Sequence, residues 1–450
     1  MSENERKPTP RCSIGAVVSA QVSGLDLKGW EGGAGSPAPW KVAYFETSRA
    51  FVTAGPLVSN QADEIVANSA FLKHVTSLGK VPIYFGTEHP LPKELDLQSV
   101  EIGLQPVWDP RRWESKLLAH RSLKEQVRRA NAKNVTTEFF NSETIPHEDK
   151  QQIGKLIQAW QESKGMPPMQ FVVTINSKTI ETCDAIIVAR TESSILGFLT
   201  IRRVYDGHSV LFENLLRSPD APNGTVELLF DAGMKWAKGA DVESVTTGLA
   251  PLAQEENTIL TSIKWASKPL FDFEGLYKFK AKFRPDNWLP IFMGVPKGTS
   301  TYRAYVEVLR AFADGSLVHF GWRTLLHNAS KVVWILALLL VPWTALLALG
   351  TTQDWFPSRN WQIGWISYDC LLFLGLTRLA SRFRPWLARF LASAAGLDFA
   401  GGLFQLATFN IHQAYGAGWF LIFVSLLAPA FAATFLLAAA RHVEQRKALS

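Results

Sequence analysis

The sequence 414-AYGAGWFLIFVSLLAPAFAATFLLAAA-440 contains no charged side chain. A helix of this length rises about 40 Å, and about 20 apolar residues already cross the hydrocarbon core of a bilayer. The run therefore predicts a membrane-spanning helix near the end of the chain. A second uncharged run, Val332 to Leu349, predicts another span. Together these two runs make residues 331–441 a membrane region, and they leave about 320 residues before it for a soluble domain.

Two further runs lie between these spans, at residues 361–377 and 390–411. Each carries one acid, Asp369 in the first and Asp398 in the second. Acids inside spans are rare, and they either pair within a bundle or mark a functional site. The sequence leaves open whether this pair forms two full spans or one re-entrant or interfacial hairpin.

Basic residues alternate along the flanks of the four runs. They are frequent before the first run, between the second and third and after the fourth, and scarce in the other two connections. The frequent positions are Arg310, Arg323, Lys331, Arg378, Arg382, Arg384, Arg389, Arg441, Arg446 and Lys447. The positive-inside rule then predicts a multi-pass protein of the cell inner membrane, with four spans and both termini in the cytoplasm. Met1 to Arg11 lacks the apolar segment of a secretory signal, which also favours a cytoplasmic soluble domain.

Charge, cysteine and histidine spacing and the motifs that are missing limit which ligands and reactions the soluble domain could serve. The net charge of +6 suits anionic partners such as phospholipid headgroups or RNA, and equally the positive-inside bias of a membrane protein. Cys12, Cys183 and Cys370 stand far apart, and the nine histidines show no HExxH spacing. We therefore expect no metal site and a reducing compartment. No Walker A loop, GxSxG, GxGxxG or kinase signature occurs, which argues against a nucleotidase, an α/β hydrolase and a dehydrogenase.

Strand and helix patterns alternate from Trp40 to residue 300, which predicts α+β or α/β layers in two successive units, each about the size of one acyltransferase domain. The predicted divisions are a flexible segment 1–39, a first unit 40–165, a second unit 166–300, a linker 301–330, the spans 331–441 and a tail 442–450. The predicted strands are 41–47, 49–56, 81–86, 99–107, 135–140, 169–174, 183–190, 195–203, 209–215 and 244–248, and the predicted helices are 62–78, 111–131, 147–164 and 225–239.

The loop 212-FENLLRSPDAPNGT-225 connects a predicted strand to a predicted helix. Its two prolines and Gly224 favour a rigid turn, and the first turn of the following helix can hold a carbonyl oxygen, a carboxylate or a phosphate. Arg217 adds a cation, Glu213 is a possible base, and Asn214 a possible polar orienter. An ordinary tight connection with solvated charges explains the same residues.

The segment 275-GLYKFKAKFRP-285 alternates aromatic and basic residues. If it is extended, one face carries a basic ridge that suits a phosphate or a developing oxyanion. The ridge would consist of Lys278, Lys280, Lys282 and Arg284. A charged outer face of a core strand is the alternative. The predicted helix 111–131 is also basic and suits phosphates of RNA or lipid, or is simply a solvated face.

Three pieces of sequence carry a family resemblance: 217-RSPDAPNG-224, 248-GLAPL-252 and the GL-x-x-FKAKFRP segment that ends at Pro285. In order and spacing they resemble the C-terminal synthase domain of lysylphosphatidylglycerol synthases, the phosphatidylglycerol aminoacyltransferases of multiple peptide resistance factor type. The similarity extends from about Trp40 to Pro296.

The resemblance implies tandem GNAT-type folds that move an amino acid from aminoacyl-tRNA to a hydroxyl of phosphatidylglycerol at the cytoplasmic leaflet, with no metal or cofactor beyond that co-substrate. It implies catalytic roles for Arg217, Lys280 and Lys282, with Glu213 replacing a family acid where this chain has Asn214. The expected substrate-binding residues are Asn214, Asp220, Asn223, Gly224 and Arg284. The oligomeric state is not implied.

Two departures leave alternatives open. Asn214 stands where the family has an acid, and Ile291-Phe292 stands where the family tends to carry Arg-Tyr. The architecture departs too, because the spans follow the synthase domain instead of preceding it. A GNAT-type acyltransferase that uses acyl-CoA or an acyl carrier protein on a lipid or amine is one alternative. A non-catalytic lipid-binding module is the other.

Overall fold

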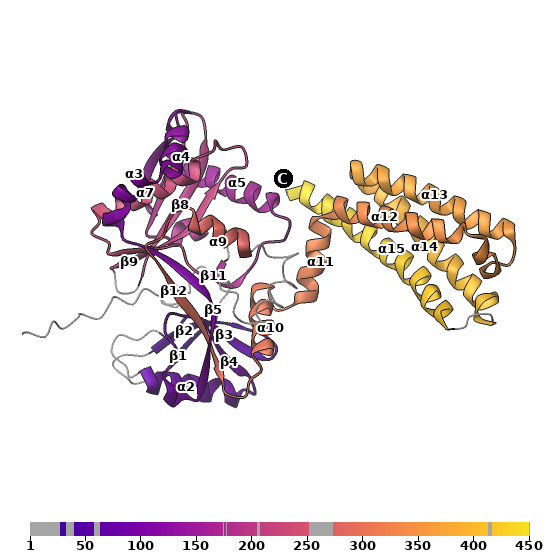
Figure 1. Cartoon of the computed structure of the whole chain (residues 1–450), viewed down its shortest axis with the longest axis horizontal. Coiled ribbons are helices and arrows are strands. Elements are labelled where there is room, and N and C mark those ends of the chain that lie inside the picture. Colours follow the sequence, from indigo (N-terminus) through magenta and orange to yellow (C-terminus); the bar gives the residue numbers. More distant parts are fainter. Residues whose placement is uncertain are drawn as a thin grey trace, which may run out of the picture. The chain divides into compact units, whose positions relative to one another are not determined.

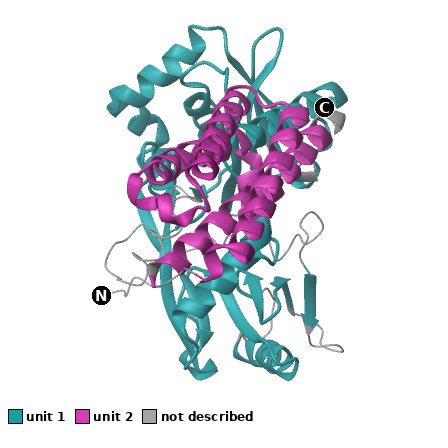
Figure 2. Cartoon of the chain, turned by 90° about the vertical axis from the view of Figure 1, so that its right-hand side faces the viewer, with its two compact units in different colours: residues 1–320 teal, residues 321–450 magenta. Residues whose placement is uncertain are grey.

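The computed structural model describes residues 28–32, 40–57, 64–173, 175–176, 178–204, 208–251, 273–412 and 416–449. The chain divides into two compact units, Met1–Phe320 and Gly321–Ser450, coloured teal and magenta in Figure 2. Each unit has hydrophobic cores of its own. The expected architecture, an α+β domain followed by an α-helical region, is confirmed.

A 12-stranded mixed sheet forms the centre of the first unit (Figure 1). Within the described residues, the pairs β3–β4 and β10–β9 are parallel and the others antiparallel. The strand order is β1 (Lys28–Gly32), β2 (Trp40–Glu46), β3 (Ala50–Ala54), β4 (Val81–Thr87), β12 (Asn287–Pro296), β5 (Leu97–Trp108), β10 (Ser244–Thr246), β9 (Ser209–Arg217), β8 (Ile195–Arg203), β7 (Ala185–Arg190) and β6 (Thr136–Asn141), and the short β11 (Ala250–Pro251) pairs with β5.

The two predicted halves exchange segments within this sheet. Strand β12 comes from the second predicted half but lies between β4 and β5 of the first, whereas β6 of the first half pairs with β7. The predicted boundary at residue 165 is therefore wrong. Sequence patterns locate strands but not their partners, and a pairing over nearly 200 residues leaves no local signal.

Helices cover both faces of the second half of the sheet. Alternation along β8 places Phe198 in a cluster with Ile153 and Ile157 of α5 (His147–Ser163). Leu199 and Ile201 point to the other face, where they join the core around α7 (Thr225–Gly239). The helix α2 (Glu64–Ser77) packs near β4 at the other end of the sheet.

Three local predictions are wrong, and each error has a physical reason. The single basic helix 111–131 is instead η3 (Pro110–Arg112), α3 (Trp113–Ala119) and α4 (Arg121–Asn131), because His120 is extended. Residues 171–173 form the 3₁₀ helix η4 and not a strand. Residues 301–330 are not a linker: α10 (Thr301–Phe312) buries Ala304, Val308 and Ala311 in the core beside β3 and β12.

The extended ridge predicted for residues 275–285 is also wrong, since Phe273–Ala281 forms the helix α9. The letters of 277-YKFKAKF-283 alternate as in a strand, but Glu274 and Lys278 form an ion pair one turn apart along this helix. In the N-terminal segment 1–39, residues 28–32 form β1, which pairs with β2. The remainder of that segment lies outside the described residues.

In the described part of the second unit, four helices are long and apolar enough to cross a membrane. They are α12 (Ala329–Leu347), α13 (Arg359–Ser381), α14 (Pro385–Thr408) and α15 (Ala417–Leu449), preceded by α11 (Leu317–His327). The helices α13 and α14 are continuous over the two runs that also suited a re-entrant hairpin. Their shared core contains Val333, Leu379, Ala388 and Phe435.

The other elements of this unit are the short 3₁₀ helices η5 (Gly350–Trp355) and η6 (Asn410–His412). Many large apolar side chains of the bundle remain exposed, among them Leu338, Leu371, Phe390 and Leu397. Exposed apolar surface of this extent is typical of a face that contacts lipid. The first unit has its own 3₁₀ helix η2 (Lys93–Leu95) and the short helix α6 (Lys178–Thr182).

Candidate active site

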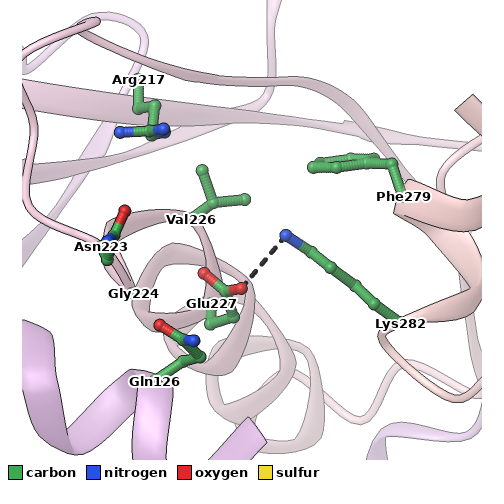
Figure 3. Close-up of a pocket in the computed structure, with 8 residues that line it drawn as sticks. All are labelled: Gln126, Arg217, Asn223, Gly224, Val226, Glu227, Phe279 and Lys282. Atoms are coloured by element: carbon green, nitrogen blue, oxygen red, sulfur yellow. Dashed lines mark ion pairs between the residues drawn. The ribbon is translucent and has the colours of Figure 1, made fainter. Parts of the chain in front are cut away.

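A cavity of about 460 Å³ lies in the first unit (Figure 3). It is formed by the loop after β9, the start of α7, and the helices α4 and α9. Its lining combines two cations, one carboxylate, two amides and an aromatic ring. The lining residues are Gln126, Arg217, Asn223, Gly224, Val226, Glu227, Phe279 and Lys282. Arg217, Asn223, Gly224 and Lys282 were predicted from the sequence as site residues, and the structure brings these four together.

Gly224 is required by the local geometry. It precedes α7 with φ +96°, and a Cβ at this position would lie 1.9 Å from the carbonyl oxygen of Gln126. Only glycine adopts this conformation without strain and leaves room for the backbone of α4. The close approach of α4 to the loop brings the Gln126 side chain to the cavity.

Arg217 is the last residue of β9 and braces the loop that follows. Its Nη1 donates a hydrogen bond to the carbonyl oxygen of Ala221 at 2.8 Å. A guanidinium has five N–H donors, so one bond to the loop leaves others for a ligand. Figure 3 shows Arg217 on a different wall of the cavity from Glu227 and Lys282. The two predicted cations therefore face a common space from separate sides.

Lys282 forms an ion pair with Glu227, with an Nζ–Oε1 distance of 3.1 Å. Its ammonium also lies 4.5 Å from the ring centroid of Phe279 and 5.0 Å from that of Phe283, within the range of cation–π attraction. Glu227 belongs to the first turn of α7, where the helix dipole favours a negative charge. Lys282 keeps 36% of its side-chain surface exposed, so it remains accessible to a ligand.

Lys280 is not part of the cavity lining. Successive residues of a helix turn by 100°, so Lys280 points about 200° away from Lys278 and Lys282. It is 6% exposed, and its ammonium donates to the carbonyl oxygens of residues 247, 248 and 249 at 2.8, 2.7 and 2.8 Å. Burial lowers the pKa of Lys280 from 10.5 to about 7. Here Lys280 fixes the connection between β10 and β11.

Glu213 and Asn214 lie along β9 and do not line the cavity. Thr200 pairs with Asn214 and Ile201 with Phe212, so Glu213 is the extra residue of a β-bulge. Its carboxylate accepts a hydrogen bond from Nε of the buried Arg202 at 2.7 Å. Asn214 is buried, and its Nδ2 donates to Thr200 Oγ1 at 3.0 Å. Both side chains are engaged in contacts within the sheet.

Asp220 and Arg284 are exposed and lie outside the cavity lining. Asp220 is at the tip of the loop, where its backbone N–H donates to Ser218 Oγ at 3.4 Å. Arg284 follows α9 with φ +53°, and its carbonyl oxygen accepts a hydrogen bond from Lys116. These two residues were predicted to bind substrate, and nothing in their geometry sets them toward the cavity.

Four lining residues were not predicted from the sequence: Gln126, Val226, Glu227 and Phe279. Glu227 had a usable signal, because it stands three residues after Gly224 in the first turn of a predicted helix. Gln126 had none, since its place depends on the packing of α4 against α7. Among the described residues, no group of three or more His, Cys, Asp or Glu side chains converges as ligands of a metal would.

The chemistry available in the cavity is electrostatic. Arg217 and Lys282 supply positive charge from two walls, and Gln126 and Asn223 supply neutral donors and acceptors. Such a set suits a phosphate or the oxyanion of an acyl-transfer intermediate. Glu227 is the carboxylate in the lining, and its Oε1 lies 3.1 Å from Nζ of Lys282.

Comparisons with known proteins agree with the resemblance read from the sequence. A phosphatidylglycerol lysyltransferase of Bacillus subtilis (strain 168) is 29% identical over 119 residues, which are 24% of this chain and 14% of that protein. This chain therefore matches only a small part of the length of that relative.

Two solved structures share the fold. One is the C-terminal domain (DUF2156) assigned to a lysylphosphatidylglycerol synthetase of Agrobacterium fabrum, with 19% identity, a TM-score of 0.59 and coverage of 68% of this chain and 95% of that chain. The L-PGS of Bacillus licheniformis gives 17% identity, a TM-score of 0.57 and coverage of 64% and 90%. The likeness shows a shared fold of mixed sheet and helices. Residues 41–294, more than half of the chain, match the family model "Phosphatidylglycerol lysyltransferase, C-terminal", and the chain belongs to this family.

Proposed function

We propose that this protein transfers an aminoacyl group from aminoacyl-tRNA to a hydroxyl of phosphatidylglycerol at the cytoplasmic leaflet. The observation that carries the proposal is the cavity: Arg217, Gly224 and Lys282 belong to the family-matched residues, and all three line one space. The family name supplies the class of lipid and the transfer of an amino acid. The donor and the leaflet are part of the proposal.

The reaction needs little covalent help, because the aminoacyl ester is already activated. The lipid hydroxyl oxygen attacks the ester carbonyl carbon, and the bond from that carbon to the tRNA ribose oxygen breaks after a tetrahedral intermediate. Lys282 and Arg217 stabilise the oxyanion of the intermediate, since both present positive charge to the cavity. The hydroxyl proton finally resides on the departing ribose oxygen.

Glu227 is the group we assign to proton transfer. Its carboxylate lines the cavity and lies 3.1 Å from the ammonium of Lys282. Glu213, the base expected from the sequence, is instead held by Arg202 and Asn214. A base must reach the proton it accepts, so position favours Glu227 over Glu213.

The four long apolar helices act in this proposal as an anchor that keeps the cavity at the membrane. The alternation of basic residues along their flanks supports a cytoplasmic location of the first unit. An acceptor lipid would then reach the cavity from the inner leaflet of the cell inner membrane. Aminoacyl-tRNA is available on the same side.

The test is a transfer assay with the full chain in membranes that contain phosphatidylglycerol. A mixture of labelled aminoacyl-tRNAs is added, the lipids are extracted, and label in the lipid fraction is measured. Absence of labelled lipid with every amino acid would refute the proposal. If label from a free amino acid or an acyl thioester reaches lipid after RNase treatment, the donor is not tRNA and a GNAT-type acyltransferase is the better assignment.

A matched pair of variants locates the reaction. Lys282→Ala removes one of the two cations that line the cavity, whereas Lys278→Ala removes an exposed lysine of α9 that pairs with Glu274 and is not part of the lining. We expect loss of transfer only in K282A. Equal activity in both variants would mean that the reaction takes place elsewhere.

A further inference from the structure

The helix α11 carries an exposed apolar stripe. Val318 and Leu325 are seven residues apart, so they point to the same side of the helix, and they are 85% and 36% exposed. Trp322 stands between them along this stripe, one turn from each. The sequence of the helix, LVHFGWRTLLH, contains one arginine and no acid. An exposed stripe of this kind marks a contact with lipid or with another protein.

One side of α11 is fixed against the membrane helices. Trp322 and Leu326 pack against the core that α12, α13, α14 and α15 share. The ring of Trp322 meets those of Phe431 and Phe435 of α15 edge-on, with centroid distances of 6.2 and 6.0 Å. These contacts fix the rotation of α11 about its own axis, and with it the direction in which the exposed stripe points.

The same contacts place α11 at the boundary of the hydrocarbon layer. The uncharged run of α15 ends at Ala440, and Phe435 and Phe431 stand about 8 and 14 Å before that end along the helix. Asn328 alone separates α11 from α12, so the end of α11 adjoins the start of another span. Figure 1 shows α11 running across the direction of α12 and α15 instead of along it. A helix in this place lies in the plane of the membrane.

The flanks of α11 differ as those of an interfacial helix do. The apolar stripe adjoins the exposed surface of the membrane helices, because Trp322 touches Phe431 and Phe431 is itself 37% exposed. His319 and Arg323, one turn apart, stand on another flank of the helix and are exposed. An arginine in this position keeps its guanidinium among the headgroups while the apolar side chains enter the acyl layer.

We propose that α11 is an interfacial helix, with Val318, Trp322 and Leu325 inserted among the first acyl carbons of the lipids. The stripe is continuous with the surface that the four spans present to lipid, so its occupant is the lipid layer and not a protein. The helix then adds a membrane contact in the plane of the bilayer to the four crossings. This contact does not depend on whether the first unit transfers an aminoacyl group.

The test measures what surrounds α11 in the full chain, reconstituted into vesicles of phosphatidylglycerol and phosphatidylcholine. In a chain that carries C12A, C183A and C370A, a single nitroxide label is attached through Val318→Cys or through Leu325→Cys. Oxygen concentrates among acyl chains and a neutral nickel chelate stays in water, and each relaxes a nitroxide that it can reach. Two positions are used so that a folding defect in one variant leaves the other to decide.

Three labelled positions serve as references. Leu338→Cys, 59% exposed on α12, reports lipid, and Lys278→Cys on α9 reports water. Arg323→Cys is the matched control on another flank of α11. We expect the ratio of oxygen to nickel relaxation at V318C and L325C to approach that of L338C and to exceed that of R323C by at least about threefold.

Two results would overturn the proposal. If the labels at residues 318 and 325 respond like the label of K278C, the stripe faces water. If neither oxygen nor the nickel chelate reaches them, a protein surface covers the stripe, either a second copy or another part of the chain. The measurement needs no aminoacyl transfer, so its outcome is independent of the proposed reaction.

Discussion

Replacing Lys280 by methionine should destabilise the first unit without altering the cavity. Methionine keeps most of the apolar volume but removes the ammonium, which leaves the carbonyl oxygens of residues 247, 248 and 249 buried without this donor. A hydrogen bond from a charged donor contributes about 1.5–3 kcal/mol, and part of that gain is offset by the cost of burying the charge. We therefore expect K280M to lower the free energy of unfolding by about 3–5 kcal/mol.

Urea unfolding of the full chain in detergent, followed by hydrogen exchange and mass spectrometry, measures this loss region by region. The amides of residues 244–251 should lose protection most, because Lys280 holds the connection between β10 and β11. The control is K282M, one residue beyond the end of the same helix, where loss of a partly exposed pair should cost no more than about 1 kcal/mol. If K280M unfolds like the wild type but transfers no aminoacyl group, Lys280 acts on a reactant and the structural role is wrong.

Three further predictions concern the first unit. Burial lowers the pKa of Lys280 to about 7, against 10.5 in the unfolded chain. Between these pH values the unfolded chain binds more protons than the folded chain, so the difference in free energy of unfolding between wild type and K280M should grow by about 1.4 kcal/mol per pH unit above pH 7. A flat difference across pH 7–9 in urea unfolding would contradict this. Gly224→Ala should lower the free energy of unfolding by at least about 2 kcal/mol, since the added Cβ would lie 1.9 Å from the carbonyl oxygen of Gln126. Gly239→Ala is the control: its Cβ would meet no atom within 4 Å, so its effect should be neutral or slightly stabilising. Glu227→Gln should slow aminoacyl transfer to lipid by about 100-fold with unchanged stability. The control is Glu274→Gln, an exposed position where the rate should not change. A rate for E227Q near that of the wild type would exclude Glu227 as the base.

The membrane helices were predictable because their signal is local. An uncharged run must be a helix to satisfy its own backbone in lipid, and the letters of residues 332–349 and 414–440 report this directly. The structure places α12 and α15 over these runs. The helix α7 was predicted with both of its ends, because Gly224 and Gly239 stand at them.

A site residue was predictable only where the same segment of sequence also contains the pattern that fixes its position. Arg217 and Gly224 stand in a loop whose prolines and glycine reveal its shape. Lys280 and Lys282 look equivalent as letters, but the helix turns one toward carbonyl oxygens and the other toward the cavity. Gln126 belongs to the site only through the packing of α4 on α7, which no local pattern encodes.

The place of β12 in the sheet has a consequence for the order of synthesis. The strand inserts between β4 and β5, so these two strands have open edges while the ribosome adds nearly 200 residues. Open edges of this kind invite wrong pairing and aggregation during that interval. Strand β12 ends at Pro296, and the first apolar helix begins at Ala329. Closure of the sheet and entry of the chain into the membrane therefore become nearly simultaneous events, and a delay in either one leaves the nascent protein with exposed strand edges beside the bilayer.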